Sequence, residues 1–229
     1  SYTRKREKKP GFSVEKLSED ETRKLYIDIL LKEAGWNINE KNVEEYPVKL
    51  KRTGGNGYVD YVLWGDDGKP LAVVEAKKAM KDAEAGKIQA KEYADSLEEF
   101  FGQRPLIFYT NGFDTYIWDD YEDYPPRKIY GFYKKSELQN LIVRRSLKKP
   151  LTEYKDFNIA GRAYQIKAIT KVFENFNAKK RKALLVMATG SGKTRVSVAI
   201  VKALMENGWV KRVLFLADRV ALVNQARDS

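Results

Sequence analysis

The sequence contains no histidine and no cysteine among its 229 residues. Without an imidazole it can form neither a serine-protease triad nor a histidine-dependent nuclease site, and without a thiolate it has no disulfide framework and no thiolate zinc site. No 20-residue apolar run is present, and the basic start of the chain is followed by no apolar signal-peptide core. These absences predict a soluble globular protein with no membrane partner and a cytoplasmic location.

The positive charge is unevenly distributed along the chain. The formal net charge is +11, and residues 151–229 carry 15 Lys and Arg against 6 Asp and Glu, a net charge of +9. Residues 1–150 carry 28 Lys and Arg against 26 Asp and Glu, a net charge of +2. The basic last third favours a polyanionic partner such as nucleic acid, although a solvated basic surface would explain the charge alone.

After a basic lead-in over residues 1–17, the sequence predicts a mixed α/β domain. Ser18 and Glu21 form a capping-box pattern, and apolar residues at helical spacing continue from it to Gly35. Three strands are expected within 45–79, separated by the turn sequences TGGNG and GDDGK. A helix over 80–100, the strand PLIFYT, an Asn-Gly turn and the strand TYIWD follow.

A charged stretch without apolar periodicity, between about residues 145 and 158, predicts a domain boundary. Beyond it, AYQIKAITKVFENF has a helical pattern, KALLVMATG reads as a strand ending in a glycine-rich turn, TRVSVAIVKALMENG is helical, and RVLFLAD reads as a second strand. Strand, loop, helix and strand in this order predict a parallel βαβ unit. The expected domains are therefore 18–148 and 149–229.

The glycine-rich turn ATGSGKT, residues 188–194, predicts a phosphate-binding loop. Such a turn directs backbone N–H groups, here those of Thr189, Gly190, Ser191 and Gly192, at phosphate oxygens. Lys193 would reach the β- and γ-phosphates of ATP, and the Thr194 hydroxyl would ligate Mg²⁺. The general pattern requires a glycine where this chain has Met187.

A pair of acidic residues in the expected sheet predicts a metal site. Side chains alternate along a strand, so Glu75 and Lys77 share a face, and counting back from GDDGK places Trp64 near Pro70 and Asp60 opposite residue 74 or 75. Adjacent carboxylates require a cation between them, and Mg²⁺ or Mn²⁺ suits oxygen ligands.

The groups around this pair could complete a phosphodiesterase site. The carbonyl of Ala76 could add a metal ligand, and Lys77 could position or deprotonate the attacking water. Gln89 and Tyr93, four residues apart, share a face of the next helix. A surface ion pair and a packed core tyrosine are the plainer interpretations of these spacings.

Several motifs in the sequence are similar to those of known families. VDYVLW, AVVEAKK and QAKEY resemble the nuclease core of the PD-(D/E)xK superfamily, and TGSGKT, with VLFLADRVALVNQA at 213–226, resembles the first motor domain of superfamily 2 helicases. From about Ser18 onward, the order of motifs resembles the restriction (motor) subunit of type I restriction endonucleases. The implied fold is α/β, a mixed-sheet nuclease-like domain followed by a truncated parallel-sheet RecA-like (P-loop) domain.

This resemblance implies roles for particular residues. Asp60 and Glu75 would be the metal carboxylates and Lys77 the catalytic lysine, with Gln89 and Tyr93 as an accessory motif near the DNA strand. The resemblance also implies that Arg162 and Gln165, with Tyr164 alongside, read the adenine. It further implies an additional acidic residue at Glu19 or Glu21, although helix capping is the simpler explanation for these two glutamates.

The same resemblance implies the cofactors Mg²⁺ (or Mn²⁺) and ATP. The implied partners are double-stranded DNA and the methyltransferase and specificity subunits of a restriction complex. The second carboxylate pair and the arginine finger of such motors are not found in the sequence, so sustained ATP hydrolysis is not expected.

Three alternatives stay open at this point. The chain could be the motor subunit of another restriction class, or a helicase-like ATPase whose first domain is an inactive nuclease fold that grips DNA. It could also be a non-enzymatic module that docks on partners through DDYEDYPPRK, residues 119–128.

Overall fold

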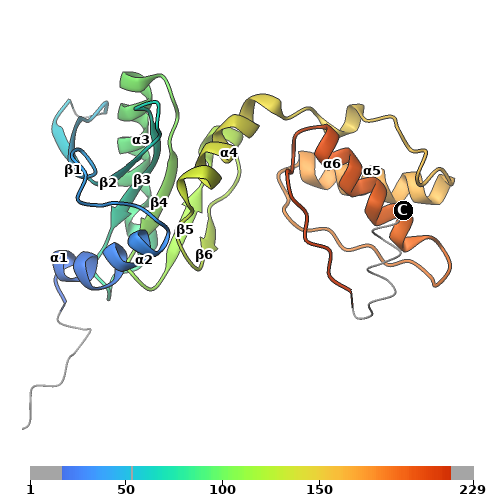
Figure 1. Cartoon of the computed structure of the whole chain (residues 1–229), viewed down its shortest axis with the longest axis horizontal. Coiled ribbons are helices and arrows are strands. Elements are labelled where there is room, and N and C mark those ends of the chain that lie inside the picture. Colours follow the sequence, from blue (N-terminus) through green and yellow to red (C-terminus); the bar gives the residue numbers. More distant parts are fainter. Residues whose placement is uncertain (1–16, 53, 218–229) are drawn as a thin grey trace, which may run out of the picture. The chain divides into compact units, whose positions relative to one another are not determined.

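The computed structural model describes residues 17–52 and 54–217 (Figure 1). The chain divides into two compact units, Ser1–Asn140 and Leu141–Ser229, here called the first and second units. Within the described residues, every helix is too short or too polar to span a bilayer. The predictions for residues 1–16 lie outside the described residues.

The first unit contains a six-stranded mixed sheet whose strands lie in sequence order. Neighbouring strands are antiparallel, except for the parallel pair β3–β4. The strands are β1 (Glu44–Lys49), β2 (Asn56–Trp64), β3 (Pro70–Ala76), β4 (Leu106–Thr110), β5 (Thr115–Trp118) and β6 (Arg127–Ile129). A parallel pair needs a crossover, which the 3₁₀ turn η3 (Ala83–Gly86) and helix α3 (Lys87–Phe101) provide. The predicted mixed α/β class is confirmed.

The β2–β3 hairpin has the register that the sequence predicts. Gly68 adopts a φ of 72° in the GDDGK turn, a conformation that glycine tolerates without strain. Trp64 pairs with Pro70, and Tyr61 pairs with Val74. One residue further along this ladder, Asp60 comes opposite Glu75.

The leading helix forms at the predicted place but is not regular. It consists of α1 (Glu19–Thr22), a π-helical turn η2 (Arg23–Ile27) and α2 (Asp28–Glu33). The capping box is confirmed, because Ser18 Oγ accepts from the Glu21 N–H at 3.1 Å and Glu21 Oε2 accepts from the Ser18 N–H at 2.8 Å. The π turn was not predicted, since apolar spacing does not reveal a single extra residue in a helix.

Helix α3 packs on the sheet and closes the main core. Its buried face meets the inner residues of β2, β3 and β4; the cluster includes Val62, Val73, Ala90, Tyr93, Leu97 and Ile107. The sequence also did not predict β6, the 3₁₀ turn η4 (Asp120–Glu122) or helix α4 (Lys135–Leu147). The turn η4 and strand β6 occupy part of the 119–128 segment.

The second unit contains the two predicted helices, α5 (Ala163–Asn177) and α6 (Lys193–Glu206), and a 3₁₀ turn, η5 (Leu151–Glu153). Their buried faces pack together; the cluster includes Leu151, Ile169, Phe173, Val196 and Ala199.

The predicted strands of this unit are wrong for the described residues. The segments 181–188 and 211–217 carry no strand pairing. Leu184, Val186, Leu214 and Leu216 are exposed, whereas Leu185 and Met187 are partly buried against the core of this unit. A parallel strand requires a hydrogen-bonded neighbour, and no described segment of this unit pairs with either one. Most of the motif expected at 213–226 lies outside the described residues.

Candidate active site and nucleotide loop

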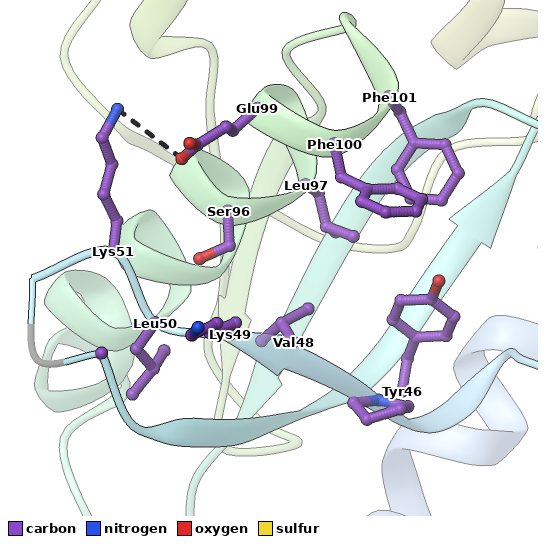
Figure 2. Close-up of a pocket in the computed structure, with 12 residues that line it drawn as sticks. Tyr46, Val48, Lys49, Leu50, Lys51, Ser96, Leu97, Glu99, Phe100 and Phe101 are labelled. Carbon is purple, nitrogen blue, oxygen red and sulfur yellow. Dashed lines mark ion pairs between the residues drawn. The ribbon is translucent and has the colours of Figure 1, made fainter.

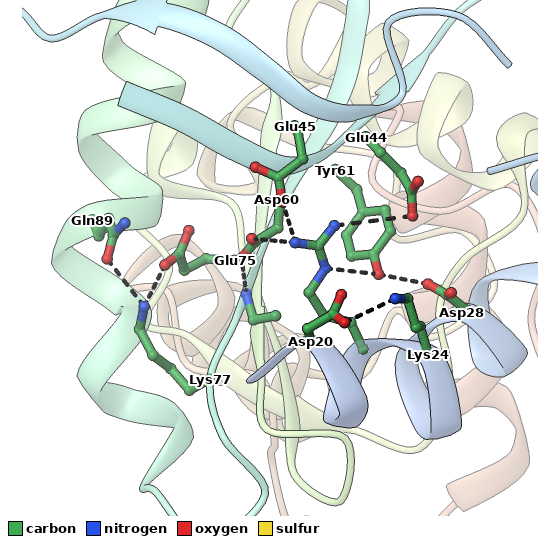
Figure 3. A network of polar contacts seen from close by, with 12 residues as sticks. Asp20, Lys24, Asp28, Glu44, Glu45, Asp60, Tyr61, Glu75, Lys77 and Gln89 are labelled. Carbon is green, nitrogen blue, oxygen red and sulfur yellow. Dashed lines mark hydrogen bonds and ion pairs between the residues drawn. The ribbon is translucent and has the colours of Figure 1, made fainter. Parts of the chain in front are cut away.

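Two buried carboxylates meet where β2 and β3 pair. Figure 3 shows Glu75 between Asp60 on one side and Lys77 with Gln89 on the other. Asp60 is 9% exposed and Glu75 is 2% exposed. Asp60 Oδ2 accepts from the Ala76 N–H at 2.7 Å, whereas Glu75 Oε1 pairs with the Lys77 ammonium. Glu75 Oε2 is buried without a hydrogen-bond partner.

Burial and mutual repulsion disfavour the charged forms of both carboxyl groups. Burial, together with the charge of Asp60, raises the pKa of Glu75 to about 8. Burial also raises the pKa of Asp60, although the Ala76 N–H and Arg23 act in the opposite direction, and the charge of Glu19 adds to both shifts. No group of three or more acidic side chains that could hold a metal is found among the described residues. Two carboxylates and an unpartnered oxygen nevertheless fit a hard divalent cation.

The remaining predicted residues of this site form a chain of contacts. Lys77 Nζ donates to Gln89 Oε1 at 3.0 Å, and Gln89 Nε2 donates to the Tyr93 hydroxyl at 2.7 Å. Tyr93 is also part of the main core, which confirms the packing interpretation, and its accessory role near DNA stays a prediction. Although burial opposes it, the contact with Glu75 raises the pKa of Lys77.

Gly86, which the sequence did not single out, lets α3 approach the site. A Cβ at Gly86 would lie 3.0 Å from Glu75 Cγ and 3.4 Å from Lys77 Cε. Any side chain here would push the start of α3, and with it Gln89, away from the carboxylates. An isolated glycine inside the helix expected over 80–100 gives little sign of such a contact.

Sequence reasoning also missed Arg23, at the start of the π turn. Its Nη1 donates to Asp60 Oδ1 at 3.2 Å and also pairs with Glu45, while its Nε donates to the Tyr61 hydroxyl at 3.3 Å. The Tyr61 hydroxyl donates in turn to Asp28 Oδ1 at 2.5 Å. The hydrogen bonds to Glu45 and Tyr61 raise the pKa of Arg23 despite its burial.

In the second unit, helix α5 contacts the glycine-rich loop. The Tyr164 hydroxyl and Gln165 Nε2 both donate to the Ser191 carbonyl, at 2.8 and 2.9 Å. Arg162 Nη1 donates to the Tyr164 hydroxyl at 3.2 Å, which brings the candidate adenine-reading residues beside the loop. Gly192 has a φ of 85°, and a Cβ there would lie 2.5 Å from Gln165 Nε2, so this position requires glycine.

The lysine of this loop folds back on its own backbone. Lys193 Nζ donates to the carbonyls of Met187 and Ala188 at 3.3 and 3.2 Å. Thr194 lies next to Lys193 in the first turn of α6. The loop therefore brings together a lysine, a hydroxyl group and a helix N-terminus, the three groups that binding of a nucleotide phosphate would need.

A cavity of about 690 Å³ lies between β1 and the end of α3, away from the carboxylate pair. Figure 2 shows Leu97, Phe100 and Phe101 directed from the helix toward Tyr46 and Val48 on the strand. Among the described residues that line it, Glu99 is the single acid, and it pairs with Lys51 at 3.8 Å. The lining combines apolar and aromatic side chains with Lys49, Lys51, Ser96 and Glu99, and it lacks the paired acids of the Asp60–Glu75 site.

Two family models match the chain in succession. Residues 18–130 match the type I restriction enzyme R protein N terminus (HSDR_N), and residues 158–229 match the type III restriction enzyme, res subunit. The first match covers the Asp60–Glu75 pair, and the second covers the glycine-rich loop.

Curated proteins and a solved structure are similar to the chain. The type I restriction enzyme EcoAI endonuclease subunit of Escherichia coli is 34% identical over 74% of this chain and 22% of its own length. The type I restriction enzyme EcoKI endonuclease subunit of E. coli K12 is 28% identical over 92% of this chain and 23% of its own length. A solved fragment assigned to an HsdR subunit of a type I restriction enzyme from Vibrio vulnificus YJ016 is 29% identical, with a TM-score of 0.46, over 85% of this chain and 39% of that one.

The chain spans about a fifth of the length of the curated relatives that it matches. The relatives are all type I restriction enzyme endonuclease subunits, and one of the two family models describes the N terminus of that protein. The sequence resemblance is thus confirmed, and the chain belongs to the family of type I restriction enzyme R (HsdR) subunits.

Proposed function

We propose that the first unit is a PD-(D/E)xK nuclease-like domain that hydrolyses DNA phosphodiester bonds with Mg²⁺ or Mn²⁺. The observation that carries this proposal is the buried Glu75 Oε2, which has no hydrogen-bond partner and lies in a site shared with the buried Asp60. Asp60, Glu75 and the carbonyl of Ala76 would hold the cation. Bound there, the cation would polarise the phosphate and the attacking water.

The neighbouring side chains would position the reacting groups. In the cation-free site, burial lowers the pKa of Lys77, but the contact with Glu75 raises it by more, which favours an ammonium that orients the water and stabilises phosphate charge. Gln89 holds Lys77 through its Oε1, and Tyr93 holds Gln89 through its hydroxyl. This chain of contacts would keep the ammonium beside the carboxylates.

The second unit would be the amino-terminal part of a RecA-like translocase domain that binds ATP. The backbone of residues 189–192 and Lys193 would contact the phosphates, Thr194 would ligate Mg²⁺, and Arg162 with Gln165 would read the adenine. The contacts of Tyr164 and Gln165 with the Ser191 carbonyl support this assignment, because they join the base-reading and phosphate-binding segments.

The whole protein would be the DNA-cleaving, ATP-dependent DNA-translocating subunit of a type I restriction-modification enzyme in the cytoplasm. Its partners would be double-stranded DNA and the methyltransferase and specificity subunits. The curated relatives support this proposal, since each is named as an endonuclease subunit of such an enzyme.

Replacing Glu75 with Ala is expected to weaken Mg²⁺ or Mn²⁺ binding about 100-fold or more, because the cation loses a direct ligand. Calorimetric titration measures this effect, and nicking of plasmid DNA in Mg²⁺ measures the activity. Glu99→Ala is the control, because Glu99 is an exposed acid on the same helix as Gln89. Equal cation binding by wild type and Glu75→Ala would refute the proposed metal site.

Replacing Lys193 with Ala is expected to weaken ATP binding roughly 10- to 100-fold, the loss of one charge-assisted hydrogen bond. Titration with a fluorescent ATP analogue measures the affinity. The exposed Lys211 provides the matched control, Lys211→Ala, which removes the same charge away from the glycine-rich loop. Unchanged affinity in Lys193→Ala would contradict nucleotide binding at this loop.

A further inference from the structure

We propose that Arg23 is a built-in counter-ion that competes with the divalent cation for Asp60 and so sets how tightly the site binds it. This inference rests on the proposed metal site but concerns a residue outside the predicted site. In the absence of a cation, the guanidinium would neutralise Asp60, and cation binding would have to displace or weaken that contact.

The two carboxylates are occupied unequally. Both oxygens of Asp60 are engaged, Oδ1 by Arg23 Nη1 at 3.2 Å and Oδ2 by the Ala76 N–H at 2.7 Å. Glu75 Oε2 has no partner. A cation that bridges the pair would therefore find an open oxygen on Glu75 and an occupied carboxylate on Asp60.

The guanidinium is held in place by its surroundings. Arg23 Nε donates to the Tyr61 hydroxyl, and the guanidinium carbon lies 5.0 Å from the centre of the Tyr61 ring. Its side chain is only 12% exposed. Arg23 begins a π-helical turn, an irregularity that occurs often at functional sites, and the adjacent Thr22 Oγ1 accepts from the Ala79 N–H at 3.2 Å, which ties this turn to the chain after β3.

Arg23 also has a second carboxylate to which it can move. The same Nη1 that contacts Asp60 pairs with Glu45, and Nη2 lies 3.9 Å from Glu44 Oε1. Both acids lie on β1, and Figure 3 shows Glu45 next to Asp60 and Glu44 farther from Glu75. If the cation took Asp60 Oδ1, the guanidinium would keep these partners rather than become an unpaired buried charge.

The charges predict the direction in which removal of Arg23 changes the affinity for the cation. A dication and a guanidinium on one carboxylate repel each other, and at an effective dielectric constant of about 20 this repulsion is worth more than about 1.4 kcal/mol, or a factor of ten. Removing Arg23 should therefore tighten cation binding by about tenfold or more. A merely structural Arg23 predicts the opposite, because its loss would disorder Asp60 and weaken binding.

The test is calorimetric titration of the whole chain with Mn²⁺, comparing wild type with Arg23→Met and Arg23→Lys. Tighter binding by about tenfold in Arg23→Met, with Arg23→Lys nearer to wild type, is expected. The matched control is Lys24→Met, because Lys24 is an exposed cation on the same turn that pairs with Asp20 at 2.8 Å. Equal or weaker binding in Arg23→Met would overturn the inference.

A second measurement does not depend on a substitution at Arg23. In wild type, the Arg23 Nε–H donates to the Tyr61 hydroxyl. Its ¹⁵N NMR signal should shift when the protein is titrated with Mg²⁺, without Mn²⁺, and the shift should level off when the cation site is full. Tyr61→Phe loosens the guanidinium and should tighten Mn²⁺ binding several-fold. A signal that does not move while Glu75-dependent binding saturates would overturn the inference.

The two proposals fail in different ways. If wild type, Arg23→Met and Glu75→Gln all lack a Mn²⁺ site, the proposed metal site itself is wrong, and this inference with it. If wild type binds Mn²⁺ in a Glu75-dependent manner but Arg23→Met binds no more tightly, only the role of Arg23 is refuted.

Discussion

In the absence of divalent cations, Glu75→Gln is expected to stabilise the first unit by roughly 4 kcal/mol at about pH 8. The folded-state pKa of Glu75 is about 8, raised by burial and by the charge of Asp60 from an ordinary value of 4.5. Between these two pH values, the folded chain binds more protons than the unfolded chain. The free energy of unfolding therefore falls as the pH rises, by up to 1.36 kcal/mol per pH unit, until the folded-state pKa is passed.

Glutamine abolishes this loss because its amide does not ionise, and its oxygen can still accept from Lys77. The measurement is denaturant-dependent hydrogen exchange of β2 and β3 amides in a chelator, from about pH 5 to about pH 9, the interval over which Glu75 titrates. Wild type and Glu75→Gln should be similarly stable at the acid end and diverge toward the alkaline end. Glu99→Gln, at an exposed carboxylate, should follow wild type within about 0.5 kcal/mol.

Added Mg²⁺ sharpens this experiment. A cation that binds the folded state restores stability to wild type at alkaline pH but not to Glu75→Gln, which lacks the second carboxylate. Parallel pH profiles for the two proteins in chelator would show that Glu75 ionises normally in the folded state. Burial beside Asp60 would then not raise the pKa of Glu75.

The second large effect is expected at Arg104, which is buried among three carboxylates. Its guanidinium contacts Asp95 at 2.5 Å, Glu98 at 3.2 Å and, through two nitrogens, Asp120. Arg104→Met removes the cation shared by the three acids and leaves Lys91, at 3.0 Å, on Asp95, which should destabilise the first unit by about 3–5 kcal/mol. Because Asp95 lies on α3, the change should also loosen the helix that carries Gln89 and Tyr93.

Urea denaturation, monitored by hydrogen exchange of the α3 and β4 amides, measures this loss of stability. The control is Arg52→Met, because the Arg52–Glu92 pair, at 2.8 Å, is largely exposed, and its loss should cost less than about 1 kcal/mol. Similar effects at Arg52 and Arg104 would mean that the Arg104 cluster is not a buried network. The pairing of Asp120 with Arg104 also places one acid of the 119–128 segment in the fold rather than in a docking surface.

The part of the fold that could be predicted depends on local signals. The GDDGK turn fixes the β2–β3 register, and this register alone brings Asp60 opposite Glu75. The spacing of Gln89 and Tyr93 predicted that they share one helix face, and on that face they form a hydrogen bond. The capping box and the Asn111-Gly112 turn could also be predicted from local signals. In the turn, Asn111 Oδ1 accepts from the Phe113 and Asp114 N–H groups.

The rest depends on contacts between segments distant in sequence. Arg23 reaches Asp60 across 37 residues and only through a π turn, so no spacing rule could reveal it. Strand β6 has three residues and α4 buries little apart from Leu138, so neither has a strong apolar period. The strands expected in the second unit were wrong because an apolar run does not supply the partner that a parallel strand needs.

The distance in sequence between Arg23 and Asp60 has a consequence for how the protein folds. The hairpin that pairs Asp60 with Glu75 closes a short loop, whereas docking of the leading helix closes a longer one and has a higher entropic cost. The two carboxylates are therefore expected to meet before the arginine arrives. At the proposed metal site, a cation present during synthesis would encounter the pair before Arg23, the proposed competitor, so this order of folding would favour loading on the nascent chain.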